Sequence, residues 1–468
     1  MGTINSAFDL ITGALDADQS ALNVVSNNVA NASNETYTRE VPNWEENQPI
    51  YINGISYGSG VSVSGGISQR DRVLEQRLQQ QTQASSSSTA LLTALTTLQD
   101  SFTPASTTSS SGNIGTDISS FFDSYTQLES SPTSNALRQQ VLSTASTLAG
   151  DISNTAASLN AQQSSLNQSA SAVASQVNAI TSSLSEVNTQ IQSLSPNADA
   201  GTLEDERQAD LGQLSQLIGF NQITTEDNGL SITTAGGQLL VSEGSSFQIT
   251  TGDVNGVTHF FVGSTDITGD LTSGGGQIGG LLTARDQTIP TTLASLDQLA
   301  YGLATQVNAV NNAGTDLDGD NGNAGNIFNA PTQVTGSAAS IKVVLTDPNK
   351  IAAAGLGSGT GDNSNAVAAA NLALATIISG QTPVNFYSNL VSTLGTTVSQ
   401  VTTQNTALTA SVSQLQGQRD ALSSVNLNDE ASSLEEFQRS YQAASQLFTI
   451  LNSIAASALN LGVETAVA

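Results

Sequence analysis

The segment after Pro132 carries the longest regular pattern in the sequence. Apolar residues recur there every seven positions in two interleaved sets, and Gln163 is the one polar member. The sets are Leu142, Ala149, Ala156, Gln163, Ala170, Val177, Leu184 and Ile191, and Ala145, Ile152, Leu159, Leu166, Val173, Ile180, Val187 and Leu194. Eight heptads that end before Pro196 predict a helix about 85 Å long, at 1.5 Å per residue. Because no compact globule needs such a helix, the chain is expected to be elongated.

Both ends of the chain carry a single apolar stripe at helical spacing, interrupted near the start by Asp18. The stripe residues are Ile4, Phe8, Ile11, Leu15, Leu22, Val25 and Val29 at the start, and Leu434, Phe437, Tyr441, Phe448 and Leu451 at the end. A helix with one stripe is marginal alone, because its stability comes from packing that stripe on another element. We therefore expect the terminal helices to pair with each other and with those of neighbouring copies, so that these residues form the assembly interface.

The segments between the terminal helices alternate in type. We expect short strands from Ile50 to Ile67, a Ser/Thr-rich loop from Ser101 to Gly115, β-type runs from Phe220 to Ile267 and a hairpin-like strand at Ser340 to Leu345. Helices are expected at Arg70 to Leu98, Leu203 to Ile218 and Leu281 to Asn312, and a heptad helix from Tyr387 to Leu422.

This order predicts a mainly α fold: a long coiled-coil-like helical bundle made from N- and C-terminal parts of the chain, with a small β-rich inserted domain. We expect residues 1–35 and 429–468 to form an inner assembly domain from the terminal helices. Residues 36–217 and 282–428 would form the long-helix bundle domain, and residues 218–281 the β insertion.

Charge and composition exclude several classes of function. The chain has 11 basic and 39 acidic residues, a net charge of −28, which repels nucleic acid and anionic membrane surfaces. It has no cysteine, which excludes disulfides and thiolate chemistry. We expect no nucleic-acid partner, no membrane partner, no cofactor and no metal ion.

Targeting signals are also informative. No Lys or Arg precedes Arg39, so the charged region of a cleavable signal peptide is missing. The uncharged stretch from Leu447 to Val463 is short and interrupted by polar residues, and we interpret it as an amphipathic helix and not as a membrane span. These features fit a cytoplasmic protein, or one exported by a route that needs no cleaved signal.

The acidic segment Asp316-Leu-Asp-Gly-Asp-Asn-Gly322 nearly spells the start of an EF-hand calcium loop. Its Gly lies one place late, and the twelfth position holds Ile327 where a calcium loop has a bidentate Glu. We therefore expect a solvated turn in preference to a calcium site.

Other residues with catalytic or binding chemistry have more ordinary interpretations. His259 is the only histidine and lies in a strand-like run, so we expect a strand position and not a catalytic or metal-binding role. The glycines from Gly274 to Gly280 lack the Lys-Ser/Thr pattern of a phosphate-binding loop, and we interpret them as a loop that re-enters the helical part.

Two sets of polar residues in the last quarter of the chain leave alternatives open. Asn405 occupies a heptad position, where it either sets helix register or lies at a wet edge. The acidic pairs Asp429/Glu430 and Glu435/Glu436 are expected to complement the dipole of the last helix and to remain in water.

Several blocks of sequence resemble, in order, those of the flagellar rod, hook and hook-associated protein family. They are Asn23-Val-Val-Ser-Asn-Asn-Val-Ala-Asn-Ala-Ser-Asn34 before Tyr37-Thr-Arg39, then Gly58-Ser-Gly-Val-Ser-Val-Ser-Gly65 before Arg70-Asp-Arg72, and finally Val425-Asn-Leu-Asn-Asp-Glu-Ala431 with Phe437-Gln-Arg-Ser-Tyr-Gln-Ala-Ala444. Two inner segments, Leu203-Glu-Asp-Glu-Arg207 and Gly361-Asp-Asn-Ser-Asn-Ala366, resemble the hook-associated branch. Asp18 and Thr36 depart from the family pattern, which usually has a small residue and a Gly at these places.

The resemblance implies a structural subunit at the junction between hook and filament. Members of the family are exported unfolded through the flagellar type III apparatus and assemble as a ring in a helical lattice outside the cell. Expected partners are therefore other copies of the chain, the hook protein, the second hook–filament junction protein, an export chaperone and the type III export apparatus. The chaperone is expected to bind the C-terminal helix.

Three alternatives remain at this stage. The chain could be another axial protein, such as the second junction protein, the hook protein or a flagellin. It could be a hydrolase with its site in the β insertion, although no motif arranges Ser and Asp residues around His259. It could also be a cytoplasmic coiled-coil scaffold.

Overall fold

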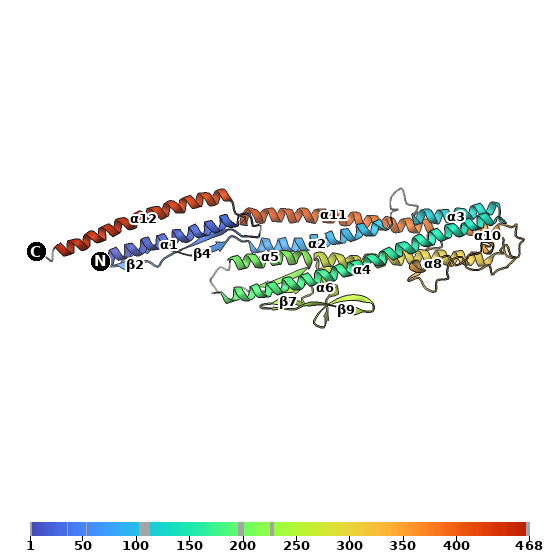
Figure 1. Ribbon diagram of the computed structural model, residues 1–468, viewed down its shortest axis with the longest axis horizontal. Coiled ribbons are helices and arrows are strands. Elements are labelled where there is room, and N and C mark those ends of the chain that lie inside the picture. The colour runs from blue at the N-terminus through green and yellow to red at the C-terminus, as the bar shows by residue number, and fades with distance from the viewer. Residues whose placement is uncertain are drawn as a thin grey trace.

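Helices aligned along one direction build most of the molecule in the computed structural model (Figure 1). Both chain ends lie at the same end of this elongated shape, where α1 (Gly2–Asn31) runs beside α12 (Leu427–Glu464). The structure describes residues 2–34, 36–52, 54–102, 113–194, 201–224 and 229–464. The expected fold class is confirmed, whereas most of the expected loop from Ser101 to Gly115 lies outside the described residues.

The helical body combines segments that are far apart in the sequence. Its long helices are α2 (Arg72–Asp100), α3 (Ile114–Ser130), α4 (Asn135–Ser193), α5 (Gly201–Leu217), α8 (Ile289–Ala313) and α11 (Pro383–Ser423). Shorter ones are α6 (Thr268–Gly274), α7 (Gly276–Thr283), the π-helical turn η1 (Ala284–Thr288), α9 (Ser337–Ser340), the 3-10 turn η2 (Pro348–Lys350) and α10 (Ser364–Asn371). Side-chain caps define several starts, since Asp71 accepts hydrogen bonds from the first amides of α2 and Ser134 from that of Leu137 in α4.

Helix α4 confirms the heptad prediction. Almost every residue of the two interleaved sets is buried, from Leu142 to Ile191, and Leu194 is exposed just beyond the helix end. The polar member of the set, Gln163, donates from Nε2 to the carbonyl of Arg285 at 2.9 Å. That carbonyl belongs to η1, so the polar heptad position satisfies a backbone acceptor where the neighbouring helix changes its winding.

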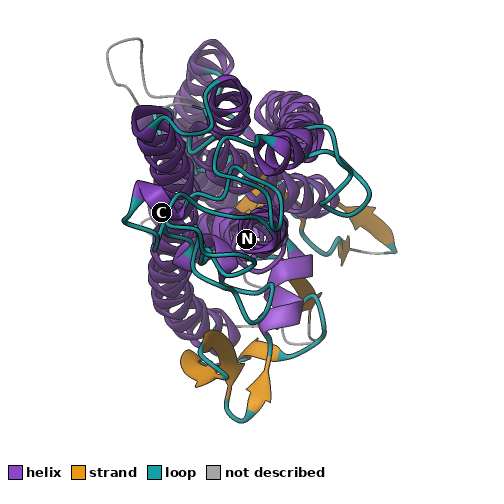
Figure 2. Cartoon of the chain, turned by 90° about the vertical axis from the view of Figure 1, so that its right-hand side faces the viewer, coloured by secondary structure: helices purple, strands orange, loops and turns teal. Residues whose placement is uncertain are grey.

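Two groups of strands lie at the periphery of the helices (Figure 2). In the first, β1 (Glu40–Glu46) pairs antiparallel with β4 (Val61–Ser68), and β2 (Ile50–Ile52) with β3 (Ile55–Tyr57). The second is the insertion, in which β5 (Phe220–Thr224), β6 (Leu230–Thr234), β7 (Leu239–Ser242) and β8 (Ser245–Ser246) form a sheet in sequence order. In the same insertion, β10 (Val257–Val262) lies between β9 (Ile249–Val254) and β11 (Thr265–Asp266).

Asparagine side chains of α4 attach the insertion to the helical body. The Asn178 amide both donates to and accepts from the backbone of Ile249, at 2.8 and 2.7 Å. Asn188 donates to the carbonyls of Leu230 and Glu243, and Asn167 to the hydroxyl of Thr258. These three residues lie about three helical turns apart, which places them on one side of α4.

The structure corrects two expectations about loops and strands. The expected loop from Gly274 to Gly280 is mostly helical: Gly274 ends helix α6, Gly276, Gly279 and Gly280 belong to helix α7, and Gly275 alone separates the two helices. A Cβ on Gly280 would lie 2.1 Å from the Ser87 carbonyl oxygen of α2. These glycines therefore permit close packing of helix backbones. The strand expected at 340–345 is absent from the described residues, where only an isolated bridge joins Phe328 and Val343 after α9.

Helix α3 was not expected from the sequence. It fills the core with a buried set of aromatic and aliphatic residues, which are Ile114, Ile118, Phe121, Phe122, Tyr125 and Leu128. Phe121 also contacts Phe328 ring to ring, with centroids 5.8 Å apart. Rings of α3 therefore form part of the core where α3, α4 and the segment after α8 meet.

Candidate assembly site

The terminal helices pair with each other inside one chain. The rings of Phe8 and Phe448 meet edge to face with centroids 5.4 Å apart, which brings the two ends of the sequence into direct contact. Ile11 and Val25 are buried in this pair. The other expected interface residues are covered only in part or exposed: Ile4, Phe8, Leu15, Leu22, Leu434, Phe437 and Leu451 are half-buried, and Val29, Tyr441 and Phe448 are exposed.

A second apolar row on α12 is exposed, and we call it the outer row. Leu447, Ile450 and Ile454 are 54%, 54% and 51% exposed, and their spacing of three and four residues places them on one helix face. This row was not predicted, because its residues lie outside the heptad register of the terminal stripe. The signal was present in the sequence, since these residues lie between the members of that register.

The strands of residues 40–68 lie along the same pair of helices. Trp44 of β1 packs against Phe437 of α12 with ring centroids 5.9 Å apart, and β4 lies on α1. At the tip of this ribbon, Ile50, Tyr51, Ile55 and Tyr57 are exposed on β2 and β3. The terminal end of the molecule therefore presents apolar side chains from the last helix and from the ribbon.

Polar contacts join the inner ends of the terminal helices around Asn28. The Asn28 amide donates to the Glu40 carbonyl at 2.8 Å and accepts from the Glu40 N–H at 3.0 Å, so it acts as a strand partner. It also donates to Glu430 Oε2 at 3.0 Å. Glu430 pairs in turn with Arg39, whose Nε lies 2.6 Å from Oε1. We call these four residues the Asn28 junction.

The Asn28 junction corrects one expectation from the sequence. Glu430 was expected to remain in water at the start of the last helix, but it is 1% exposed. Its burial is possible because Arg39 and Asn28 bind both carboxylate oxygens. Tyr37 donates its hydroxyl to Asn28 Oδ1 at 2.8 Å, and burial, together with the nearby Glu40, Asp205 and Glu430 carboxylates, raises the pKa of that phenol.

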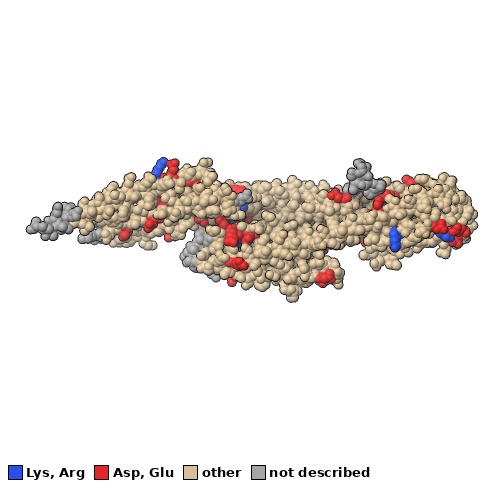
Figure 3. All heavy atoms as spheres, in the orientation of Figure 1, with Lys and Arg blue, Asp and Glu red and all other residues tan. Residues whose placement is uncertain are grey.

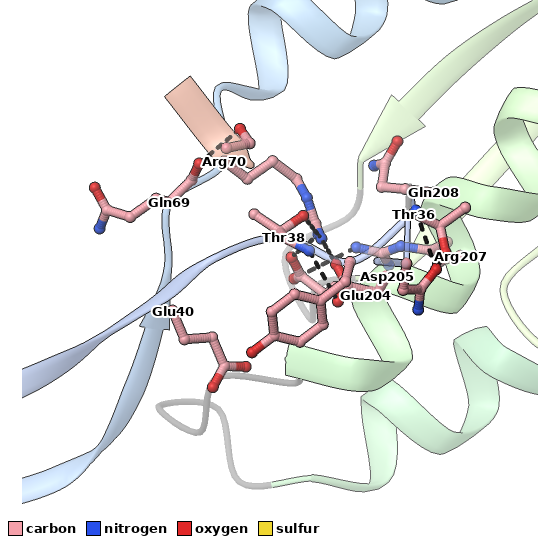
Figure 4. A network of polar contacts seen from close by, with 12 residues as sticks. Thr36, Thr38, Glu40, Gln69, Arg70, Glu204, Asp205, Arg207 and Gln208 are labelled. Atoms are coloured by element: carbon pink, nitrogen blue, oxygen red, sulfur yellow. Dashed lines mark hydrogen bonds and ion pairs between the residues drawn. The ribbon is translucent and has the colours of Figure 1, made fainter. Parts of the chain in front are cut away.

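A buried charge network connects the junction to the helical body (Figure 4). The Arg70 guanidinium binds Glu204 at 2.9 Å, also binds Asp205, and donates to the Thr38 hydroxyl at 2.9 Å. Arg72 approaches the same Glu204 at 3.1 Å. Two sequence blocks about 130 residues apart, Arg70-Asp-Arg72 and Leu203-Glu-Asp-Glu-Arg207, are thus in direct contact.

Burial dominates the electrostatics of this network. It raises the pKa of the Asp205 carboxyl, although Arg70 and the hydrogen bonds from Thr38 oppose the shift. It also lowers the pKa of the Arg207 guanidinium, which Glu204 opposes. Breaking one of these pairs would leave a buried charge without its partner, which is more costly than losing a surface ion pair.

The two residues that depart from the family pattern are accommodated differently. Thr36 donates from both its N–H and its hydroxyl to Asn34 Oδ1, which ties it to the turn after α1. Asp18 is buried in α1, and its Oδ2 has no hydrogen-bond partner among the described residues.

The other singled-out residues lie away from this end. His259 on β10 contacts Asp266 Oδ2 through Nδ1 at 2.6 Å, so it occupies a strand position as expected. Asn405 accepts a hydrogen bond from the Thr89 hydroxyl at 2.9 Å, which joins α11 to α2 and favours the register interpretation. Glu435 remains exposed and pairs with Arg439 one helical turn later.

Comparison with known proteins places these observations in a family. Residues 95–328 match the family model described as the flagellar hook-associated protein FlgK helical domain, and residues 10–38 match that of the flagella basal body rod protein. The chain belongs to the FlgK family. The first match spans α3, α4 and the insertion, and the second spans most of α1 with the signature around Asn28.

Individual relatives agree with this assignment over nearly the whole chain. The chain is 25% identical to flagellar hook-associated protein 1 of Escherichia coli (strain K12), across 98% of this chain and 100% of the relative. It is 24% identical to the protein of the same name from Bacillus subtilis (strain 168), across 96% of each. These relatives carry names of structural flagellar proteins, as the sequence blocks implied.

A solved structure shares the fold. The flagellar hook junction protein FlgK from Burkholderia pseudomallei aligns with a TM-score of 0.65 and 18% identity, over 74% of this chain and 99% of that chain. In addition, none of the helices among the described residues is both long and apolar enough for a membrane span.

Proposed function

We propose that this chain is a structural subunit of the bacterial flagellum that joins the filament to the hook. One observation carries the proposal: the terminal helices pair with each other but leave apolar rows exposed at one end of the molecule. The chain belongs to the FlgK family, which agrees with an assembly role. Exposed apolar rows of this kind mark a surface to which another molecule binds. The names of the relatives, hook-associated and hook junction proteins, support the position in the flagellum.

Assembly would bury what a single chain leaves exposed. The proposed interface consists of the two terminal stripes together with the outer row of α12. The stripe residues are Ile4, Phe8, Ile11, Leu15, Leu22, Val25, Val29, Leu434, Phe437, Tyr441, Phe448 and Leu451. Ile11 and Val25 are already buried within one chain and would hold the helix pair together, while the others would become covered on assembly. Each large apolar side chain that becomes fully buried stabilises the assembly by roughly 1.5–3 kcal/mol. A ring of copies in a helical lattice gives every subunit the same neighbours, so the same rows would be covered in each.

The proposed domains have different roles in the assembly. We propose that residues 1–35 and 429–468 form the inner assembly domain, that residues 36–217 and 282–428 form the long-helix bundle, and that residues 218–281 form an outer insertion. The Asn28 junction and the Arg70 network would then fix the direction of the terminal helices relative to the bundle. Buried ion pairs suit this role because their geometry is specific.

Further partners and the location of the protein follow from the same role. The hook protein and the second junction protein would contact the ring on its two sides, and the chain would be secreted by the type III apparatus without a cleaved signal peptide. We infer that an export chaperone covers the C-terminal helix before assembly. Removal of residues 429–468 should then abolish chaperone binding, and an unchanged dissociation constant would contradict this inference.

A double substitution on the outer row of α12 tests the proposal. In cells that lack the gene, the variant Ile450→Asp with Ile454→Asp should still fold, because both residues are exposed in the monomer. We expect it to be exported, but to leave hooks without filaments and to release flagellin into the medium. Electron microscopy of hooks and immunoblots of the medium measure both results.

The control is Val254→Asp, an exposed valine of β9 in the insertion, which should support normal filaments. Export is measured first, since a loss of secretion would report on the chaperone and not on assembly. Normal filaments from an exported double variant would contradict the proposed interface.

Antibody labelling of isolated flagella separates a junction protein from a hook or filament subunit.

A further inference from the structure

The acidic turn after α8 is largely exposed, as expected for a solvated turn, but its first residue is not. Asp316 is fully buried, and it lies with Asp318 and Asp320 around the side chain of Lys350. The lysine Nζ is 3.1 Å from Asp316 Oδ2, 3.0 Å from Asp318 Oδ2 and 2.6 Å from Asp320 Oδ2. One ammonium group therefore contacts the carboxylates at the first, third and fifth positions of a segment that resembles the start of a calcium loop.

The backbone holds this lysine in place. Lys350 ends the 3-10 turn η2, which begins after Asp347 accepts a hydrogen bond from the Asn349 N–H. The Asn349 carbonyl accepts from the Leu317 N–H at 3.0 Å, which ties η2 to the acidic turn. The position of the Lys350 ammonium is therefore fixed by an ordered backbone segment.

The acidic turn is also ordered from within. The Asp320 N–H donates to Asp316 Oδ1 at 2.9 Å, and the Asp316 N–H donates to the Asp320 carbonyl at 3.1 Å. The three carboxylates supply three negative charges, and Lys350 supplies one positive charge. The hydrogen bonds to all three carboxylates raise the pKa of Lys350, so the ammonium stays protonated.

A second cation near the turn, Arg138, is buried, whereas Lys350 is partly exposed. Arg138 of α4 is fully buried and donates to the Pro132 carbonyl at 2.6 and 3.0 Å, and also to the Ile351 carbonyl. Burial lowers the pKa of the Arg138 guanidinium to about 10. The nearby Asp316 carboxylate opposes this shift. The carboxylates of the acidic turn thus interact with Arg138 of α4 and with Lys350 of η2, next to the core at this end of the molecule.

We propose that Lys350 is the built-in cation of the acidic turn. Its ammonium takes the central position that a calcium ion occupies among such carboxylates, and it makes the order of this end independent of divalent ions. Among the described residues, no group of three or more His, Cys, Asp or Glu side chains is arranged to hold a metal ion. Without the lysine, three neighbouring carboxylates repel one another and present oxygen ligands of the kind that calcium binds.

The test compares Lys350→Met with Lys342→Met in the full-length chain. The methionine keeps the length and the apolar stem of lysine but removes the charge, and Lys342 is an exposed lysine in the same region. Hydrogen–deuterium exchange of the segments 314–325 and 347–354 is measured in EDTA and in CaCl₂. In EDTA we expect Lys350→Met to exchange at least about tenfold faster than the parent chain, because the buried Asp316 loses its counter-charge.

Calcium provides the second readout. It should slow exchange in Lys350→Met toward the rate of the parent chain, and should leave the parent chain and Lys342→Met unchanged. Unchanged exchange in Lys350→Met in EDTA would overturn the proposal, because the ammonium would then not order the turn. Faster exchange that calcium does not reverse would also overturn it, because the turn would then not be a cradle for a cation.

Discussion

Buried polar side chains carry out much of the specific packing in this chain at the scale of single residues. Aromatic residues make up 4% of the sequence, so ring packing anchors few of its loops. Asparagine amides take this role. Asn308 both donates to and accepts from the backbone of Phe328. Asn311 donates to the Gly325 carbonyl and accepts from the Ala352 N–H. An amide that replaces a strand partner fixes both position and orientation of the segment it binds.

A buried pair of carboxyl groups makes the stability of the body depend on pH. Burial, and then the neighbouring Asp151 of α4, raise the pKa of Asp117 on α3 from its ordinary 3.8 to about 7. A raised pKa means that the folded state holds the proton more tightly than the unfolded state. The contribution of Asp117 is therefore complete below about pH 4, and it is lost as the pH rises to about 7.

We expect Asp117→Asn to remove this dependence, because an amide donates to Asp151 at every pH. Relative to the parent chain, the free energy of unfolding of Asp117→Asn should rise between pH 4 and pH 8, as measured by urea denaturation. Asp123→Asn, on the exposed face of the same helix, is the control and should show no such trend. A constant difference between Asp117→Asn and the parent chain across this range would contradict the assignment.

At the scale of elements, hydrophobic periodicity predicted the long helices. The other features depend on contacts between residues that are far apart in the sequence. Helix α4 could be read from its heptads, because one face must be buried over its whole length. The partners of Glu430 could not be predicted, because Arg39 and Asn28 lie about 400 residues earlier in the sequence. No neighbouring residue indicates that this carboxylate is buried. Strand β1 was missed because it contains Pro42, which is tolerated where the register shifts between Pro42 and Trp44.

The glycines of α7 show why composition misled the sequence analysis. Glycine disfavours helices by about 1 kcal/mol relative to alanine, so a glycine-rich segment is expected to be a loop. Here tertiary packing outweighs this preference: a side chain at Gly280 would meet the Ser87 carbonyl and the Leu91 nitrogen of α2. Glycine is therefore required by the neighbouring helix and not by a turn.

This explanation predicts opposite effects for two Gly→Ala substitutions. Gly280→Ala should lower the free energy of unfolding by roughly 1–3 kcal/mol or more, because the helix backbones have to move apart. Gly150→Ala in α4 should raise it by about 0.5–1 kcal/mol, because its Cβ meets no atom within 4 Å and alanine favours the helix. Chemical denaturation of both variants measures the difference, and equal effects would show that packing against α2 does not select the glycine.

At the scale of the whole molecule, charge opposes the association that we propose. The net charge is −28, and most of the 11 basic residues already form ion pairs within the chain. On the face drawn in Figure 3, most atoms are uncharged and the acidic side chains lie in small separate groups. Little positive charge therefore remains to attract a second copy, and contact between copies has to rely on apolar rows such as the outer row of α12.

The ionic strength of the solution should then control association. At about 0.01 M salt the screening length is about 30 Å, so acidic copies repel one another over most of a contact, whereas at about 1 M it is about 3 Å. We expect sedimentation equilibrium to show tighter association of the chain as NaCl is raised across this range, because repulsion is screened and apolar contacts are not. The double variant Ile450→Asp with Ile454→Asp should lose this response, since it lacks the apolar surface. Association that weakens with added salt would instead show that pairs of opposite charge hold the copies together.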